Sequence, residues 1–493
     1  MNKQTIAQSL DCDLDIFRND LRNASELVVR LYERLDATRI TPAKTHREIA
    51  SLFDEPLPEE PRAMECIFSE VESKIFANST LYLSPRFFGY INSGGNQASI
   101  LGELLASAVN QILALWHFSP AASEVERRVI QWIAEFIGYP CQAGGCLLSG
   151  GSAGNLVGLA VARKQKAPFD ADSVGTRGGP PLTVYASEEA HASVDKAMMI
   201  LGMGRDQLRK IAVRDDFTID LEALEKQVSK DRDSAYHPIC VVGVAGTTNS
   251  GAVDPLNALA DFCQAQGLWF HVDAAYGGPA ARTEIAGKLF QGLERADSVV
   301  VNPHKWLYVP AEAACILVRE AAALRHTFQV LADYLKRERE EEAGTDVPLD
   351  FKDYGPQLHR NFRALKVWMT FKAYGAEKLR AAIESNIEIM RYLANRIDES
   401  QDFVRLAPVP LSVVCFQYRT TDNFRHTDQQ YLDDLNNRML DALEKDGRVF
   451  LSGTTIHGKR ALRACSVNHR LRREDVDFLL DVTRQVGRSL AGL

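Results

Sequence analysis

Short apolar runs alternate with longer segments of helical periodicity through the middle of this 493-residue chain. Such a chain can bury its apolar runs as strands only if the intervening helices cover both faces of the sheet. We therefore predict an α/β fold with a mainly parallel, seven-stranded sheet flanked by helices. The predicted strands are residues 146–149, 183–186, 208–213, 239–245, 268–272, 298–302 and 314–318.

One of these runs, the three valines at 299–301, ends in the polar cluster Asn302-Pro303-His304-Lys305. Open α/β sheets bind their ligands outside the carboxyl ends of their strands, which is where this cluster falls. A lysine there is poorly solvated, so its charged form is disfavoured and its amine becomes a usable nucleophile. Taken alone, Lys305 is also compatible with a lysine that only extends into solvent from a strand end.

Three further stretches place polar residues after predicted strands. Asp273 follows the apolar run 267–272, and His191 comes shortly after the strand at 183–186. Gly150-Gly151-Ser152 turns from a strand into a helix, whose first amides can bind a phosphate. A lysine, an acid, a phosphate site and an imidazole are together the parts of a site for pyridoxal 5'-phosphate (PLP).

A series of short motifs carries a resemblance to a known family. The motifs are Phe87-Phe88-Gly89-Tyr90, Ser119-Pro120-Ala121 with Glu124-Val125-Glu126, Gly246-Thr247-Thr248, His271-Val272-Asp273-Ala274-Ala275-Tyr276 and Asn302-Pro303-His304-Lys305-Trp306. In these motifs the chain resembles the group II PLP-dependent decarboxylases, which include the aromatic-L-amino-acid, histidine and glutamate decarboxylases. The resemblance implies a fold type I PLP enzyme that acts as a homodimer, with its active site at the subunit interface.

The resemblance also implies a role for individual residues. Lys305 would bind PLP covalently, Asp273 would keep the pyridine nitrogen protonated, and His191 would stack on the ring and take part in proton transfer. These three and Tyr354 are the predicted catalytic residues. The other predicted cofactor residues are Gly151, Ser152, Asn302 and His304 for the phosphate, Ala275 beneath the ring, and Thr248 beside the cofactor or the substrate carboxylate.

The predicted reaction is the loss of carbon dioxide from an L-amino acid to give an amine. The same fold serves aminotransferases, other lyases and desulfurases, so the fold alone does not decide the reaction. A desulfurase needs an exposed, activated thiol, whereas Cys240 and Cys315 fall within predicted strands. Because the α-carboxylate is the group that leaves, we expect no strong arginine clamp on it.

The predicted substrate residues are Tyr90, Ile91, Ser93, Trp116 and Phe351. These walls are largely apolar and aromatic, which suits an indole, phenol or phenyl side chain. We therefore expect an aromatic L-amino acid of the tryptophan, tyrosine, phenylalanine or dihydroxyphenylalanine type. A decarboxylase of a non-aromatic amino acid is the alternative.

The segment from about residue 336 to 355 is charged and polar, which is typical of a solvated linker or of an active-site lid. Decarboxylases of this kind carry a tyrosine there as the expected proton donor. Counting back without gaps from residues 360–366 places Phe351 at that position, and a phenylalanine there accompanies aldehyde formation in some plant relatives. Tyr354 and Tyr334 are the alternative donors, so both an amine and an aldehyde product stay open.

Composition excludes several other classes of protein. The net charge of −8 gives no reason to expect a nucleic acid or an anionic membrane as a partner. Nine cysteines without CxxC pairs fit a reducing compartment, and no apolar run approaches the ~18 residues of a membrane span. We expect a cytoplasmic enzyme that binds no metal ion.

Three parts of the chain are predicted. Residues 1–84 form a helical segment that packs on a dimer partner, with packing on its own large domain as the alternative. Residues 85–374 form the large PLP-binding domain, and residues 375–493 form a small α+β domain.

Overall fold

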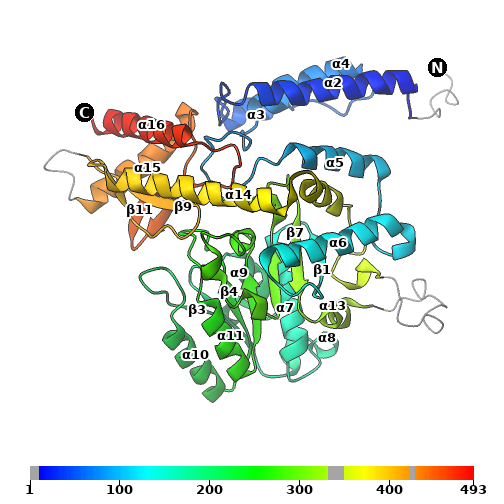
Figure 1. Ribbon diagram of the computed structural model, residues 1–493, viewed down its shortest axis with the longest axis vertical. Coiled ribbons are helices and arrows are strands. Elements are labelled where there is room, and N and C mark those ends of the chain that lie inside the picture. Colours follow the sequence, from blue (N-terminus) through cyan, green and yellow to red (C-terminus); the bar gives the residue numbers. More distant parts are fainter. Residues whose placement is uncertain (1–9, 331–348, 421–427, 493) are drawn as a thin grey trace.

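The computed structural model describes residues 10–330, 349–420 and 428–492. Its centre is a seven-stranded sheet in the order β1-β7-β6-β5-β4-β2-β3, which confirms the predicted α/β fold (Figure 1). The strands are β1 (Gly144–Leu148), β2 (Leu182–Ser187), β3 (Leu208–Ile211), β4 (His237–Val244), β5 (Trp269–Asp273), β6 (Ser298–Val301) and β7 (Ala314–Val318). Every strand end lies within two residues of its predicted position.

The directions of these strands decide where a site can form. β2, β3, β4, β5 and β6 pair in parallel, and β7 alone of the seven described strands runs antiparallel to its neighbours β1 and β6. The carboxyl ends of β1, β2, β4, β5 and β6 therefore meet at one edge of the sheet. That edge is where open α/β sheets bind their ligands.

Helices pack against both faces of this sheet (Figure 1). They bury the strands almost completely, which explains why the strand sequences are continuous apolar runs. The helices of the large domain are α5 (Gln97–Val109), α6 (Pro120–Ile137), α7 (Gly151–Lys166), α8 (Ala171–Val174), α9 (Ser193–Ile200), α10 (Leu221–Asp233), α11 (Leu256–Gln266), α12 (Pro303–Trp306) and α13 (Ala321–Phe328).

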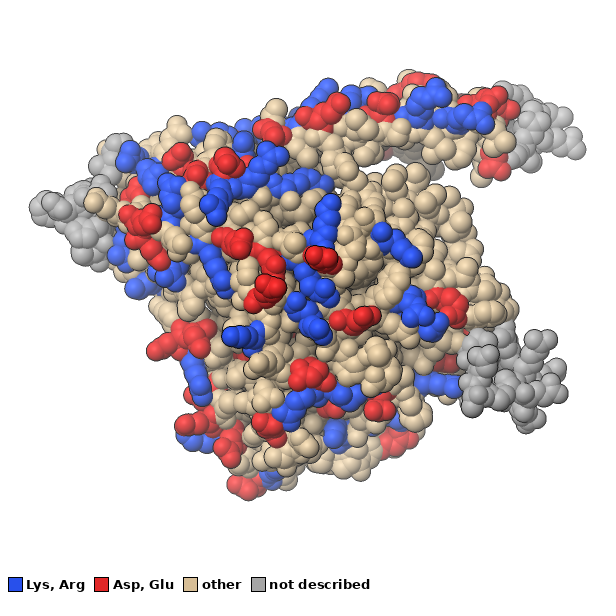
Figure 2. Space-filling view, viewed as in Figure 1, with Lys and Arg blue, Asp and Glu red and all other residues tan. Residues whose placement is uncertain are grey.

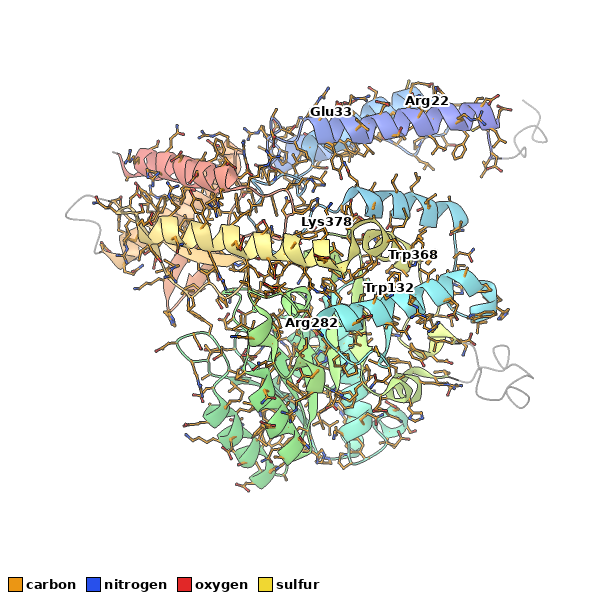
Figure 3. The ribbon with its side chains drawn as sticks, in the orientation of Figure 1. Arg22, Glu33, Trp132, Arg282, Trp368 and Lys378 are labelled. Carbon is orange, nitrogen blue, oxygen red and sulfur yellow. The ribbon has the colours of Figure 1, made fainter. Side chains whose placement is uncertain are left out.

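A long helix, α14 (Ala364–Asp398), leads from the large domain to the small one. The sequence predicts two helices here, at 361–374 and 378–400. Gly375 explains why two helices are predicted where α14 is continuous. Its φ of 72° and ψ of 160° break the helical geometry within α14. Before this break α14 packs on α6, and Trp132 of α6 lies near Trp368 of α14 (Figure 3). The ammonium of Lys372 lies over both of these rings.

The C-terminal part has its own four-stranded sheet in the order β10-β11-β9-β8. Its elements are β8 (Phe403–Arg405), β9 (Val413–Tyr418), α15 (Gln429–Asp446), β10 (Ser452–Ile456), β11 (Lys459–Cys465) and α16 (Arg473–Ala491). A second hydrophobic cluster, separate from that of the large sheet, lies beneath it.

The sequence also predicts a strand near residues 448–452, and this prediction is wrong. The strand begins instead at Ser452, because β10 and β11 form a hairpin around His457 and Gly458, whose φ values of 47° and 76° suit a tight two-residue turn. Phe450 makes backbone hydrogen bonds to Arg86 and Phe88 in the loop before α5 rather than to the sheet.

The N-terminal helices α2 (Leu14–Glu33) and α4 (Met64–Glu70) form a pair that extends away from the rest of the chain (Figure 1). The short helix α3 (His46–Ser51) between them was not predicted, although Thr45 and Glu48 form a capping box at its start. Large apolar side chains of α2 are exposed, among them Leu14, Phe17 and Leu21.

Charges on the face shown in Figure 2 are intermixed, except near α5, where few charged side chains appear. Helix α5 has an exposed apolar stripe at helical spacing, formed by Leu101, Leu104, Leu105 and Val109. Among the described helices, none has the length and apolar composition needed to cross a membrane.

Candidate active site

A cavity lies at the carboxyl edge of the large sheet. Its wall consists of Gly151, Ser152, Asn155, His191, Ser193, Val244, Gly246, Thr248, Asp273, Ala275, Tyr276, Asn302 and Lys305. Every predicted cofactor residue except His304 is in this wall. The tertiary structure thus brings together residues that come from five separate strand ends.

Lys305 lies in α12, the single helical turn that follows β6, and its backbone amide donates to the carbonyl of Asn302 at 2.9 Å. Burial lowers the pKa of the Lys305 ammonium, and the nearby carboxylate of Asp273 partly opposes this effect. A lysine with a lowered pKa has more of its amine in the nucleophilic form at neutral pH.

Asp273 is the last residue of β5 and is almost wholly buried. Its Oδ1 accepts a hydrogen bond from the amide of Ala275 at 3.2 Å, and its Oδ2 accepts one from Nδ2 of Asn155 at 2.8 Å. These contacts hold the carboxylate in place at the cavity wall. A carboxylate in that position can keep a pyridine nitrogen protonated.

The start of α7 forms the phosphate end of the cavity. No side chain caps this helix at Gly150, so its first amides are available to an anion. A Cβ on Gly151 would lie 2.9 Å from Nδ2 of Asn302, which shows how closely the start of α7 approaches the segment after β6. The Oδ1 of Asn302 is buried and makes no hydrogen bond to the described residues, as expected of an atom placed for a polar ligand.

His191 lies at the rim of the cavity, between β2 and α9. Its Nδ1 accepts a hydrogen bond from the amide of Ser193 at 3.2 Å and lies 2.8 Å from the hydroxyl of the same residue. Because Nδ1 is an acceptor, the proton of the neutral ring belongs on Nε2. Loss of contact with water lowers the pKa of His191, which favours this neutral form.

His304 lies behind Asn302 instead of in the cavity wall. Its Nδ1 contacts the backbone of Ala313, and its Nε2 is 3.5 Å from Nδ2 of Asn302. Burial lowers the pKa of His304 to about 4, so the ring is neutral at pH 7. Direct contact with a phosphate stays a prediction for this residue.

The five predicted substrate residues do not line the cavity of the single chain. Tyr90 is 58% exposed, although its carbonyl accepts from Arg463 at 3.2 Å, and Ile91 is buried in the main core. The hydroxyl of Ser93 accepts from Gly95. The indole of Trp116 donates to Glu124, and Phe351 is a core residue.

Phe351 lies in the core, and the partly buried Tyr354 packs against it, away from the cavity. The guanidinium of Arg360 covers the Phe351 ring at 4.8 Å. The Tyr354 ring lies 3.6 Å from the Cβ that Gly144 would carry, at the amino end of β1, whereas the cavity is at the carboxyl end. The third donor named from the sequence, Tyr334, lies outside the described residues.

Three buried polar residues in or near the cavity wall were given no role from the sequence. Asn155 interrupts the apolar face of α7, and His271 shares one strand face with Asp273 by the two-residue period of β5. Those two patterns are visible in the sequence. Arg463 gives no such signal, because it belongs to β11 of the small sheet.

Arg463 is 3% exposed, and its Nε donates to the carbonyl of Thr248 at 2.8 Å. Its Nη2 is buried and makes no hydrogen bond to the described residues, and its charge acts on Lys305. Arg463 is not part of the cavity wall of the single chain, but a buried arginine with a free donor and a charge that acts on Lys305 is a candidate contact for a substrate carboxylate. This was not expected from the sequence.

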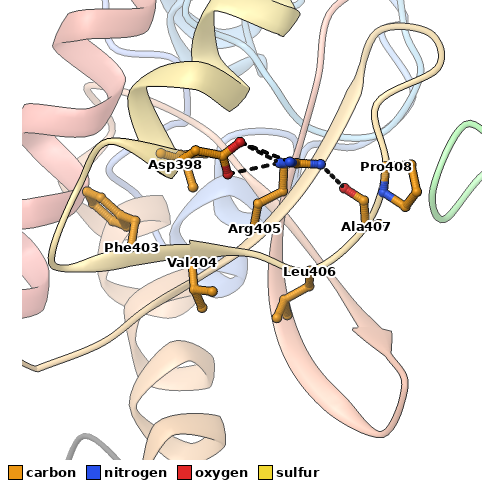
Figure 4. A pocket seen from close by; sticks show the side chains of 8 residues that line it. Asp398, Phe403, Val404, Arg405, Leu406, Ala407 and Pro408 are labelled. Carbon is orange, nitrogen blue, oxygen red and sulfur yellow. Dashed lines mark hydrogen bonds and ion pairs between the residues drawn. The ribbon is translucent and has the colours of Figure 1, made fainter.

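A second pocket lies on the surface of the small domain, where α14 ends and β8 begins (Figure 4). Its two charged side chains, Asp398 and Arg405, pair with one another at 2.9 Å, and Arg405 also donates to the carbonyl of Ala407. These groups are therefore already occupied. The pocket has none of the chemistry of the sheet-edge cavity.

The residues at the sheet edge fit PLP. Lys305 can hold it covalently, Asp273 can pair with its ring nitrogen, and the start of α7 with Asn302 can hold its phosphate. When bound, PLP provides an electron sink for the pair of electrons that the departing carboxylate leaves on Cα.

Comparisons with known proteins agree with this chemistry. The sequence profile of the pyridoxal-dependent decarboxylase conserved domain matches residues 45–419. The chain is 30% identical over 471 residues to an aromatic-L-amino-acid decarboxylase of Bacillus atrophaeus, covering 96% of this chain and 95% of that protein. It is 29% identical to a phenylacetaldehyde synthase of Arabidopsis thaliana, covering 89% and 88% of the two chains.

Among solved structures, that of Oryza sativa TDC with PLP and tryptamine superposes with a TM-score of 0.91 at 27% identity. The superposition covers 98% of this chain and all of that one. The protein is a carboxy-lyase that uses PLP, and it belongs to the family of pyridoxal-dependent decarboxylases.

Proposed function

We propose that this enzyme decarboxylates an aromatic L-amino acid to the corresponding amine. The observation that carries the proposal is the single cavity in which Lys305 lies with Asp273 and His191 in the same wall. The relatives support the substrate class, because an aromatic-L-amino-acid decarboxylase matches nearly the whole chain.

Three residues of the chain would have separate roles in the reaction. Lys305 would hold the cofactor and release it to the substrate amine. Arg463 would orient the substrate by its carboxylate through the free Nη2. His191, protonated on Nε2, would be placed to move a proton at the cavity rim.

We also propose that the active unit is a homodimer. The apolar stripe of α5 and the apolar side chains of α2 are exposed in the single chain, which is typical of a surface that another chain covers. Phe118 is exposed as well, at 58%, beside Trp116. In a dimer these aromatic residues would line the cavity of the partner subunit and complete the substrate site.

The test is a panel of tryptophan, tyrosine, phenylalanine, dihydroxyphenylalanine, histidine, glutamate and cysteine sulfinate. Carbon dioxide, amine, aldehyde and peroxide are measured in the same reactions. We expect carbon dioxide and amine in equal amounts from one or more of the four aromatic substrates. Turnover confined to the last three substrates would contradict the proposed substrate class.

A second candidate function is that of an aldehyde synthase, which would release aldehyde, ammonia and peroxide. Its support is the match to a phenylacetaldehyde synthase and the position of Phe351 in the sequence. Because Phe351 is buried in the core and Tyr354 packs against it away from the cavity, Tyr334 is the donor to test first. Tyr334→Phe should raise peroxide sharply if the wild type makes amine. The matched variant Tyr354→Phe should leave the product unchanged.

A cytoplasmic location stays a prediction. All nine cysteines are free, and six of them are buried, as in a protein that does not rely on disulfide bonds.

A further inference from the structure

Asn155 is a fully buried amide in the second turn of α7, at the back of the cavity wall. Its Nδ2 donates to Oδ2 of Asp273 at 2.8 Å and to the hydroxyl of Ser193 at 2.8 Å. Its Oδ1 lies 3.0 Å from Nε2 of His271. Asn155 thus joins three side chains that come from two elements, His271 and Asp273 of β5 and Ser193 of α9.

The orientation of this amide is fixed from behind by His271. Burial lowers the pKa of His271 to about 4, so the ring is neutral and carries one N–H. Nδ1 of the ring lies 2.7 Å from the hydroxyl of Ser298, which already accepts from the indole of Trp269 at 2.8 Å. The hydroxyl proton of Ser298 is therefore free to point at Nδ1, which places the ring proton on Nε2, facing Oδ1 of Asn155.

A reversed amide would be costly. It would place Oδ1 of Asn155 against a carboxylate oxygen of Asp273, and the Nδ2 group against the N–H of His271. In a buried site each such unsatisfied contact costs about 1–3 kcal/mol in general. The chain of donors from Trp269 through Ser298 and His271 therefore permits one orientation of the amide.

The same amide is also linked to His191 through Ser193. Ser193 accepts from Asn155, so its own hydroxyl proton is free for Nδ1 of His191, 2.8 Å away. This contact keeps the His191 proton on Nε2. One buried amide thus contacts the acid directly and the rim histidine through a single hydroxyl.

We propose that Asn155, locked by His271 and Ser298, is the positioning residue that orients both Asp273 and His191 toward the cofactor. The inference rests on the proposed function, since Asp273 acts on a ring nitrogen only when PLP is bound. Asn155 itself does not touch the reacting atoms. Its effect is to fix which oxygen of Asp273, and which nitrogen of His191, faces the cavity.

The experiment compares binding of two probes to the cofactor-free protein, PLP and its 1-deaza analogue, in which a CH replaces the ring nitrogen. Dissociation constants are measured by absorbance titration for wild type, Asn155→Leu, Ser298→Ala and Asp273→Asn. Thr483→Val, which removes a buried hydroxyl in α16 far from the cavity, is the matched control.

We expect Asn155→Leu to weaken PLP binding roughly tenfold and the analogue less than about threefold, because the amide acts through the ring nitrogen. Ser298→Ala should give the same pattern with a smaller change, and Thr483→Val should change neither constant. Circular dichroism checks that each variant is folded. If Asn155→Leu does not fold, Ser298→Ala decides the question alone.

The role of Asn155 would be overturned if Asn155→Leu weakened binding of PLP and of the analogue equally. It would also be overturned if folded Ser298→Ala kept the wild-type preference for PLP over the analogue. Failure of the proposed function looks different. In that case wild type itself would bind PLP no better than the analogue, and Asp273→Asn would leave both constants unchanged.

Discussion

The surroundings of Lys305 favour its neutral amine. Lysines usually hold their proton well above neutral pH, but this one is removed from water at a strand end and faces one carboxylate, Asp273. Burial disfavours the ammonium, and the single acid opposes that effect only in part. A larger share of this amine is therefore neutral than in an exposed lysine at the same pH.

Lys305→Ala should lose the absorbance band of the covalently bound cofactor, and borohydride should no longer fix PLP to the chain. Steady turnover should fall by several orders of magnitude, because the covalent step is lost. A normal absorbance band in the variant would assign the covalent bond to another lysine.

His271 should make the stability of the folded chain depend on pH. Its pKa is about 4 in the folded chain, against about 6.5 when unfolded, so only the unfolded chain gains a proton between those values. The contribution of neutral His271 to the free energy of unfolding is complete above pH 6.5. It is lost as the pH falls toward 4, by up to roughly 3 kcal/mol.

Thermal unfolding of wild type and His271→Gln between pH 7 and 4.5 checks this. The variant should be less stable at pH 7, but its Tm should depend less on pH, so that the two curves converge in acid. Parallel curves would mean that His271 is not the group that titrates.

At the scale of elements, the site depends on how closely α7 approaches the sheet. Gly154 faces Val300 of β6, and Gly158 faces His271 of β5. A Cβ on Gly158 would lie 2.4 Å from Cε1 of the His271 ring, far inside contact distance. The glycines allow the helix to bring Asn155 within hydrogen-bonding reach of both His271 and Asp273.

Gly158→Ala tests this packing. We expect a loss of about 1–3 kcal/mol in stability, because the ring is held by hydrogen bonds on both sides and cannot move away freely. The measurement is the shift in Tm together with PLP affinity. Adding His271→Ala, which removes the ring, should make the two costs less than additive. Strict additivity would show that the contact is not the cause.

At the scale of the molecule, one chain presents a cavity with cofactor chemistry but without the predicted substrate walls. Tyr90 and Phe118 are exposed, and the apolar stripe of α5 faces outward. These features have one simple explanation if a second copy of the chain covers them, because exposed apolar surface of this size is otherwise unfavourable. Substrate specificity would then be a property of the pair of chains.

Leu104→Lys places a charge in the centre of the α5 stripe, where Leu104 is 52% exposed. Light scattering should show a shift from dimer to monomer, and activity per chain should fall at least about tenfold. The control is Leu289→Lys, an exposed leucine on the large domain outside the stripe. An intact dimer in Leu104→Lys would place the interface elsewhere.

Much of the fold followed from local patterns. The seven strand positions, the glycine turn into α7 and the polar residues after the strands are all determined by short stretches of sequence. The carboxyl ends of parallel strands lie at one edge of a sheet, so the sequence predicts that Lys305, Asp273 and Gly151 lie close together. Local patterns failed where pairing decides the structure, as in the β10–β11 hairpin.

The sequence by itself determined the sheet, the position of the cavity and the cofactor chemistry, because these depend on residues next to strand ends. Only the tertiary structure decided which buried polar groups meet. Asn155 and Asp273 are 118 residues apart, and Arg463 reaches Thr248 from the other domain across 215 residues. Hydrogen bonds of that kind depend on the distances between packed elements, which no local pattern of residues encodes.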